Sequence, residues 1–125
     1  TDLITATLSG SVSAVEQVIT DMGPEEISKN NFAYTSMVAA IFGGRANIAE
    51  VLLSKTDLPI DSQGVTGNSG LMFAARWGQL SSAKLLLEAG ADVAIKNNNG
   101  DTALSLAMKA GHREIVTLLR AYGAV

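Results

Sequence analysis

Apolar residues recur along the chain in short stripes, each of which fits a helix of two or three turns. Near the C-terminus a first stripe is followed by Gly111, which would stop the helix as a C-cap residue does. A second stripe has the i, i+1, i+3, i+4 spacing of one helical face. The two stripes are Ala103, Leu104, Leu106 and Ala107, then Ile115, Val116, Leu118 and Leu119. The pattern predicts a pair of short helices.

The same pair of stripes recurs four times. Four series of residues share the spacing 34, 34 and 33: Ala6, Ala40, Ala74 and Ala107; Gly10, Gly44, Gly78 and Gly111; Val18, Leu52, Leu86 and Leu119; Val15, Ala49, Ala83 and Val116. Helices of this length are unstable alone. We therefore expect neighbouring pairs to stack and to share one continuous core, as in a repeat protein.

Polar stretches rich in Asn and Gly separate the helix pairs. Residues 96–100 read Lys-Asn-Asn-Asn-Gly, and Asn30-Asn31 lie at an equivalent place. Asn and Gly tolerate positive φ, so these stretches predict tight hairpin-like turns. The first two connections are one residue longer, and we expect irregular hairpins there because they contain Pro24 and Pro59. The turns divide the chain into windows 1–29, 30–63, 64–96 and 97–125, of which the first is partial.

The fourth window resembles the ankyrin repeat. The resemblance rests on Asn99-Gly100-Asp101-Thr102-Ala103-Leu104, on Ala107, on Gly111-His112-Arg113-Glu114-Ile115-Val116 and on Leu118-Leu119. Residues 84–93 resemble the second helix of that repeat and the start of its hairpin. The resemblance implies an all-α ankyrin-repeat solenoid of helix-turn-helix pairs joined by β-hairpin-like loops. We expect it to form a single domain over residues 1–125.

Composition and charge narrow the possible partners. The formal net charge is −3 and no cluster of Lys and Arg is present, which argues against nucleic-acid or anionic-membrane binding. Cysteine is absent, which fits a reducing intracellular compartment, the cytoplasm or the nucleus. No apolar run has the length needed to span a bilayer. Because the chain opens on Thr1 and its first window is partial, we expect it to be part of a larger protein.

The chain offers little catalytic chemistry. Its only histidine is His112, where the ankyrin pattern places a structural histidine. Without Cys, with one His and without a spaced Asp loop, we expect neither a metal site nor a cofactor. The glycine-rich stretch 64–70 lacks the Lys-Ser/Thr ending of a phosphate-binding loop, so we interpret it as structural. We expect adjacent Glu25 and Glu26 to point into solvent. No catalytic residue is predicted, and the chain is not expected to be an enzyme.

The resemblance also implies where a partner binds, because members of the family use the hairpin tips and the inner face of the first helices. The equivalent positions of this chain include four of its six aromatic residues, with Ala33 standing where the turn glycine of window two would lie. The alternative is that these rings pack on neighbouring hairpins. The predicted binding residues are Asn31, Phe32, Tyr34, Phe42, Asn68, Arg76, Trp77, Asn99, Asp101 and Lys109.

These observations favour a protein-protein interaction module, an adaptor, scaffold or inhibitor, that binds a protein or peptide in the groove. The alternative is a module for a nucleotide-like small ligand, for which Arg76 and Lys109 are few cations. We expect a monomer, with self-association possible through an exposed apolar N-terminal end of the stack. The core is expected to include Phe73, Tyr122, Met37, Met72 and Met108.

Overall fold

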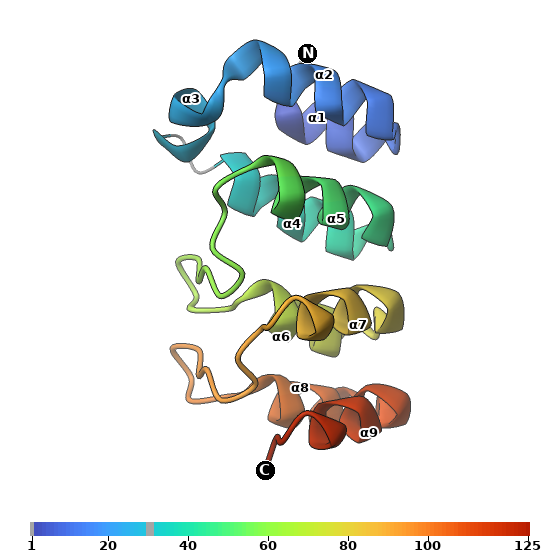
Figure 1. Cartoon of the computed structure of the whole chain (residues 1–125). Helices are drawn as coiled ribbons and strands as arrows, with labels where there is room; N and C mark the ends of the chain where they lie inside the picture. The colour runs from blue at the N-terminus through green and yellow to red at the C-terminus, as the bar shows by residue number, and fades with distance from the viewer. Residues whose placement is uncertain (1, 30–31) are drawn as a thin grey trace. The chain divides into compact units, whose positions relative to one another are not determined.

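The computed structural model describes residues 2–29 and 32–125, and within them every regular element is a helix. The chain divides into two compact units, residues 1–59 (unit 1) and residues 60–125 (unit 2), which are described separately below (Figure 1).

Unit 1 contains two antiparallel helix pairs and one additional helix. α1 contacts α2 and α4, α5 contacts α2 and α4, and α3 lies against α2 and α4. Their bounds are α1 Leu3–Ser9, α2 Val12–Met22, α3 Pro24–Lys29, α4 Phe32–Phe42 and α5 Ala46–Lys55. Each pair buries one face of its helices, including Leu3, Val15, Ile41, Ile48 and Leu52, all of them essentially inaccessible to solvent.

The connection between α2 and α4 differs from the prediction. Instead of a turn, the chain forms α3, with Pro24 at its first position. Glu25 and Glu26 lie in its first turn and are exposed, as expected. Proline fits the first helical position because it lacks an N–H that would be unpaired there, and acidic side chains are favoured at a helix N-terminus. The buried side chain of Ile27 then anchors α3. The predicted turn at Asn30-Asn31 lies outside the described residues.

Unit 2 repeats the arrangement of two helix pairs. α6 contacts α7 and α8, and α9 contacts α7 and α8. The bounds are α6 Gly70–Trp77, α7 Leu80–Glu88, α8 Ala103–Ala110 and α9 Arg113–Ala121. The first helix of each pair is capped by a hydroxyl: Ser69 accepts from the backbone N–H of Met72 (3.4 Å), and Thr102 forms a capping box with Ser105.

Burial confirms the repeat register that the sequence predicted. The alanine series is at most 1% exposed, and Val18, Leu52, Leu86 and Leu119 are at most 7% exposed. Met37 and Met72 are buried as predicted. The prediction was wrong for Met108 and Tyr122, which are 55% and 45% exposed, and Phe73 is only half-buried. Met108 occupies the position of the buried Ala75, which the next helix pair covers, whereas no described element covers Met108.

The loops that precede α6 and α8 carry the predicted hairpin-like turns of unit 2. They lie on the same side of the unit (Figure 1). Each turn is closed by two backbone hydrogen bonds, from Gly64 to Asn68 (3.2 Å) and from Gly67 to Gly64 (2.9 Å) in one, and from Asn97 to Asp101 (2.9 Å) and from Gly100 to Asn97 (3.0 Å) in the other. The two tips are also joined, because Asn98 donates its backbone N–H to the carbonyl of Thr66 (3.1 Å).

Within each unit, a side chain of the second pair lies over the glycine that ends the first helix of the preceding pair. In unit 2 the His112 ring covers Gly78, so a Cβ at Gly78 would lie 2.7 Å from its Cε1 atom. Nε2 of His112 lies 3.2 Å from the carbonyl oxygen of Arg76, to which the Nε2–H tautomer donates. In unit 1 the guanidinium of Arg45 covers Gly10. These contacts tie consecutive helix pairs together away from the hairpins.

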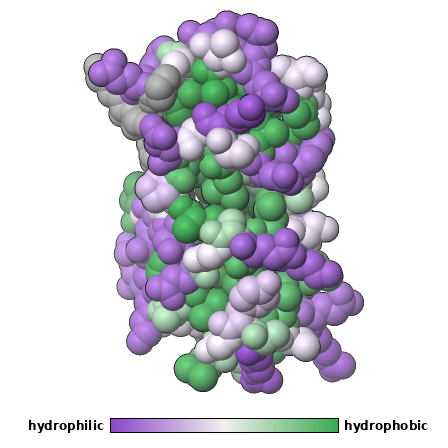
Figure 2. Space-filling model, viewed as in Figure 1, coloured by the Kyte–Doolittle hydropathy of each residue, from purple (hydrophilic) through white to green (hydrophobic). Residues whose placement is uncertain are grey.

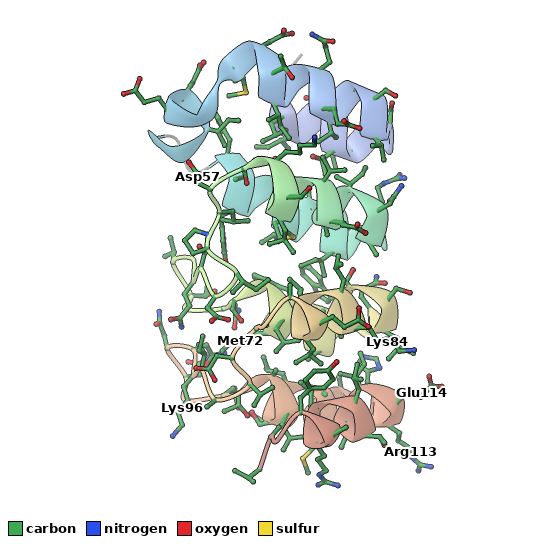
Figure 3. All side chains as sticks on the ribbon, viewed as in Figure 1. Asp57, Met72, Lys84, Lys96, Arg113 and Glu114 are labelled. Carbon is green, nitrogen blue, oxygen red and sulfur yellow. The ribbon has the colours of Figure 1, made fainter. Side chains whose placement is uncertain are left out.

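The outward face of α8 and α9 differs from the equivalent face of the other repeats. Arg113 and Arg120 are exposed there, whereas the equivalent positions hold Val12, Ala46 and Leu80, and Ile19, Leu53 and Leu87. The two arginines flank a hollow of about 460 Å³ whose floor includes Met108 and Val116. Figure 3 shows Arg113 extending away from the helix pair. On the visible face of unit 2, hydrophilic residues gather at the edges and hydrophobic residues lie between them (Figure 2).

Candidate functional site

A pocket of about 400 Å³ in unit 2 lies between the hairpin tips and the C-terminal ends of α6 and α8. We call it the unit 2 pocket. The hairpin tips contribute mainly amide and hydroxyl groups, and the helices contribute two basic side chains. Its lining residues are Thr66, Asn68, Arg76, Asn97, Asn99, Asp101, Leu106, Lys109 and Ala110.

The unit 2 pocket brings together half of the residues that the sequence predicted for binding: Asn68, Arg76, Asn99, Asp101 and Lys109. All five residues therefore lie close together on one surface. Their role in binding stays a prediction. Asn31 lies outside the described residues. The remaining four, Phe32, Tyr34, Phe42 and Trp77, lie on α4 and α6 and do not line this pocket.

Side-chain amides hold one wall of the pocket in place. Asn97 donates to Oδ1 of Asn68 (2.9 Å), and Asn68 donates to the hydroxyl of Thr66 (3.1 Å). Oδ1 of Asn97 in turn accepts from the backbone N–H groups of Asn99 (2.9 Å) and Asp101 (3.0 Å). Such a turn, closed by the side chain of Asn97, fixes the hairpin tip before any ligand arrives. Asn97 was not among the predicted site residues, although an Asn at the start of a turn is a recognisable signal for a side chain that bonds to the turn backbone.

Asp101 and Lys109 form the ion pair of the pocket. The Nζ atom of Lys109 lies 2.7 Å from Oδ1 of Asp101, and the same oxygen accepts from the hydroxyl of Ser105 at 3.0 Å. Hydrogen bonding to Lys109, and then to Ser105, lowers the pKa of the Asp101 carboxyl below its usual value of 3.8. Asp101 is therefore ionised in neutral solution, and it neutralises one of the two cations of the pocket.

We expect Lys109→Gln to raise the pKa of Asp101 toward 3.8, because the hydrogen bond that lowers this pKa most is lost. Folding lowers this pKa, so the ionised carboxylate stabilises unit 2 at pH values above the usual pKa of 3.8. This stabilisation is lost as the pH falls through the lower pKa of the folded state. An NMR titration of the Asp101 side-chain carboxyl in the acidic range measures this pKa in the unmodified chain and in the variant. Ser105→Ala should raise the pKa less, and an unchanged pKa in Lys109→Gln would contradict the assignment.

Trp77 and Phe73 stack on one another. Their ring centroids lie 4.8 Å apart with an angle of 25° between the planes, and both residues are half-buried. The alternative raised from the sequence was that the predicted binding rings pack on neighbouring hairpins, whereas this stacking partner of Trp77 lies on the same helix, α6. Part of the Trp77 ring surface remains accessible to a partner.

The prediction for window two placed Phe32 and Tyr34 on a hairpin tip, which is wrong. Both lie in the first turn of α4, with the buried Ala33 between them. The window has Ala33 where a turn glycine would stand, and without that glycine the helix extends to Phe32. At the other end of α4, Phe42 is 67% exposed, and Leu8 at the equivalent position of α1 is 59% exposed. We call these two residues the unit 1 apolar pair.

No group of three or more potential metal ligands occurs among the described residues. Over the same residues, no helix has both the length and the apolar character needed to cross a membrane.

A family model described as ankyrin repeats (3 copies) matches residues 3–97 and 60–125. The chain belongs to the ankyrin repeat family. The all-α ankyrin-repeat fold that the sequence predicted is thereby confirmed. Ankyrin repeats are in general modules that bind other proteins rather than catalytic domains. His112, the side chain that covers Gly78, is in this chain a structural contact between two ankyrin repeats.

Three relatives illustrate the range of ankyrin-repeat proteins that the chain is similar to. It is 52% identical over 52 residues (42% of the chain) to "Probable E3 ubiquitin-protein ligase XBOS33" of Oryza sativa subsp. japonica. It is 36% identical over 87 residues (68% of the chain) to the ankyrin repeat and KH domain-containing protein mask of Drosophila melanogaster. It is 29% identical over 133 residues (98% of the chain) to a serine/threonine-protein kinase of Mus musculus. The matches cover 10%, 2% and 16% of these relatives, so the chain spans only a small part of each.

Proposed function

We propose that this ankyrin-repeat chain is an adaptor, scaffold or inhibitor module that binds a segment of a partner protein through the unit 2 pocket, with the unit 1 apolar pair as a second contact surface. The observation that carries the proposal is the convergence of Asn68, Arg76, Asn99, Asp101 and Lys109 on one pocket. The hydrogen bonds between the hairpin tips hold that surface before binding, and such preorganisation reduces the cost of association.

Charge and composition favour a protein over a nucleotide-like ligand. The unit 2 pocket has two cations, and one of them is already neutralised by Asp101 at 2.7 Å. The phosphates of a nucleotide would therefore meet a single uncompensated guanidinium and a carboxylate that repels them. A polypeptide segment, in contrast, can use the amide groups of the pocket wall for hydrogen bonds. The exposed Leu8 and Phe42 offer a separate apolar contact on unit 1.

Filling the pocket tests the proposal. Ala110 lines the pocket at the end of α8, and Ala121 is an exposed alanine at the end of α9 that does not. We expect Ala110→Tyr to reduce recovery of the bound partner about tenfold, because loss of one central contact commonly costs more than 1 kcal/mol. The measurement is a pull-down from a lysate of the source organism, quantified by mass spectrometry. The matched control, Ala121→Tyr, should recover the partner like the unmodified chain.

Equal recovery of the same proteins by the unmodified chain, Ala110→Tyr and Ala121→Tyr would exclude the unit 2 pocket as the binding surface. Thermal melting of both variants shows whether either substitution acts through stability instead. Both alanines are exposed, so we expect the two melting temperatures to agree with each other.

A further inference from the structure

The unit 2 pocket contains one cation that has no counter-ion in unit 2. Arg76 is exposed at the C-terminal end of α6, and in the part of the chain that the structure describes its guanidinium forms no ion pair. Its backbone is nevertheless held in place, because the carbonyl oxygen of Arg76 lies 3.2 Å from Nε2 of His112. The backbone of Arg76 is thus fixed by His112, and the N–H groups of its guanidinium are available to a ligand.

The other two charges of the pocket, those of Lys109 and Asp101, cancel each other. Lys109 and Asp101 are 2.7 Å apart, so together with Arg76 the pocket has two positive charges and one negative charge, a net charge of +1. A ligand group with one negative charge would balance it. A phosphate group, with nearly two negative charges in neutral solution, would be left partly unbalanced and would be repelled by Asp101.

The geometry of the free donors also fits a carboxylate. A guanidinium presents parallel N–H groups that match the two oxygens of a carboxylate, and such bidentate pairs are the stronger hydrogen bonds of proteins. Two further groups in the pocket can donate. The side-chain amide of Asn99 has no hydrogen bond within the described residues, and the hydroxyl of Thr66 accepts from Asn68 but keeps its own hydrogen.

We infer that the unit 2 pocket binds the carboxylate of an aspartate or glutamate side chain of the partner, with Arg76 as the residue that anchors it. The inference rests on the proposed function and narrows it to acidic partner segments. It also assigns different chemistry to the two units. The position of Arg76 is occupied by Leu8, Phe42 and Lys109 in the other repeats, so exposed apolar side chains occupy it in unit 1 and basic side chains occupy it in unit 2.

A peptide selection tests the inference without knowledge of the natural partner. The probe is a displayed library of random linear peptides, selected on the immobilised full chain and then screened for loss of binding to Ala110→Tyr, which fills the pocket. We expect the retained peptides to be enriched in Asp and Glu relative to the unselected library. Replacing the critical Glu by Gln, or the Asp by Asn, in one such peptide should weaken binding about tenfold, and Arg76→Gln should do the same.

The two losses should not add. When the neutral peptide is measured against Arg76→Gln, binding should be no weaker than with either change alone, because both changes remove the same interaction. Arg76→Lys keeps the positive charge but not the two parallel N–H groups, and we expect an intermediate loss of peptide affinity. Lys84→Gln is the matched control. Lys84 is exposed on α7, and Figure 3 shows its side chain extending away from the helix, so the same loss of charge outside the pocket should leave binding unchanged.

Three results would overturn the inference. Peptides that are lost in Ala110→Tyr but show no acidic enrichment, or that bind Arg76→Gln as well as the unmodified chain, exclude the carboxylate and leave the proposed function intact. Tighter binding of a phosphoserine peptide than of its glutamate counterpart, by tenfold or more, assigns the pocket to phosphate. A library that yields no peptide sensitive to Ala110→Tyr removes the proposed function of the pocket together with the inference.

Discussion

Replacing Leu86 by alanine is expected to destabilise the chain by about 2–5 kcal/mol, because it opens a cavity in the core of unit 2. Leu86 lies on α7 and is 1% exposed, and it belongs to the series of apolar residues that occupies the same buried position in the second helix of each helix pair. Chemical denaturation followed by circular dichroism measures the loss. For a chain of this size it represents a large fraction of the total stability.

Leu8→Ala provides the matched control for this prediction. It deletes the same atoms, but Leu8 is 59% exposed, so we expect a loss well below 1 kcal/mol. A Leu86→Ala variant as stable as Leu8→Ala would contradict the repeat register on which the description of both units depends.

Gly78→Ala is expected to destabilise the chain by about 2–4 kcal/mol. Two costs combine at this position. Gly78 has φ = 71°, a conformation that side chains with a Cβ adopt at a cost, and the new methyl group would lie 2.7 Å from the His112 ring. To make room, the ring would have to move and give up its contact with the carbonyl oxygen of Arg76. Equilibrium unfolding of the variant measures the sum of both costs.

Gly111→Ala separates the two costs. Gly111 ends α8 with φ = 78°, but apart from its own atoms and those of its chain neighbours, no neighbouring group lies within 4 Å of the position that its Cβ would take. We therefore expect only the backbone cost, about 1–2 kcal/mol. Adding His112→Ala to Gly78→Ala should relieve the steric part of the loss. If Gly78→Ala is no more destabilising than Gly111→Ala, the packing of His112 on Gly78 contributes little to stability.

The repeat register and the helix pairs were predictable because small and apolar residues recur with a fixed spacing. Ala74 and Ala107 are buried where the register places them, and Gly78 and Gly111 end their helices in the left-handed conformation. The residues expected at the binding surface came from the resemblance to the ankyrin repeat, and five of them line the unit 2 pocket. The division into four repeats in one domain stays a prediction.

Other features depend on contacts that a spacing does not reveal. The sequence contains a signal for α3, a proline followed by two glutamates. We nevertheless predicted an irregular hairpin there, because the neighbouring helix pairs are joined by hairpin-like turns. Met108 follows the apolar pattern and is nevertheless exposed, because burial depends on whether a neighbouring element covers it. The pairing of Asp101 with Lys109, eight residues away, requires the course of the backbone from the hairpin tip to the end of α8. The uncompensated charge of Arg76 is visible only once that pair is known.

The two arginines on the outward face of α8 and α9 have a consequence for polymerisation. A head-to-tail contact between identical copies does not close on itself, and it can therefore grow into a fibre. For a second copy to lay an apolar helix pair on this face, Arg113 and Arg120 would have to lose their hydration, at an effective cost of several kcal/mol for each ion. The two charges therefore oppose head-to-tail stacking between isolated copies of residues 1–125 on this face, although Met108 and Val116 also line it.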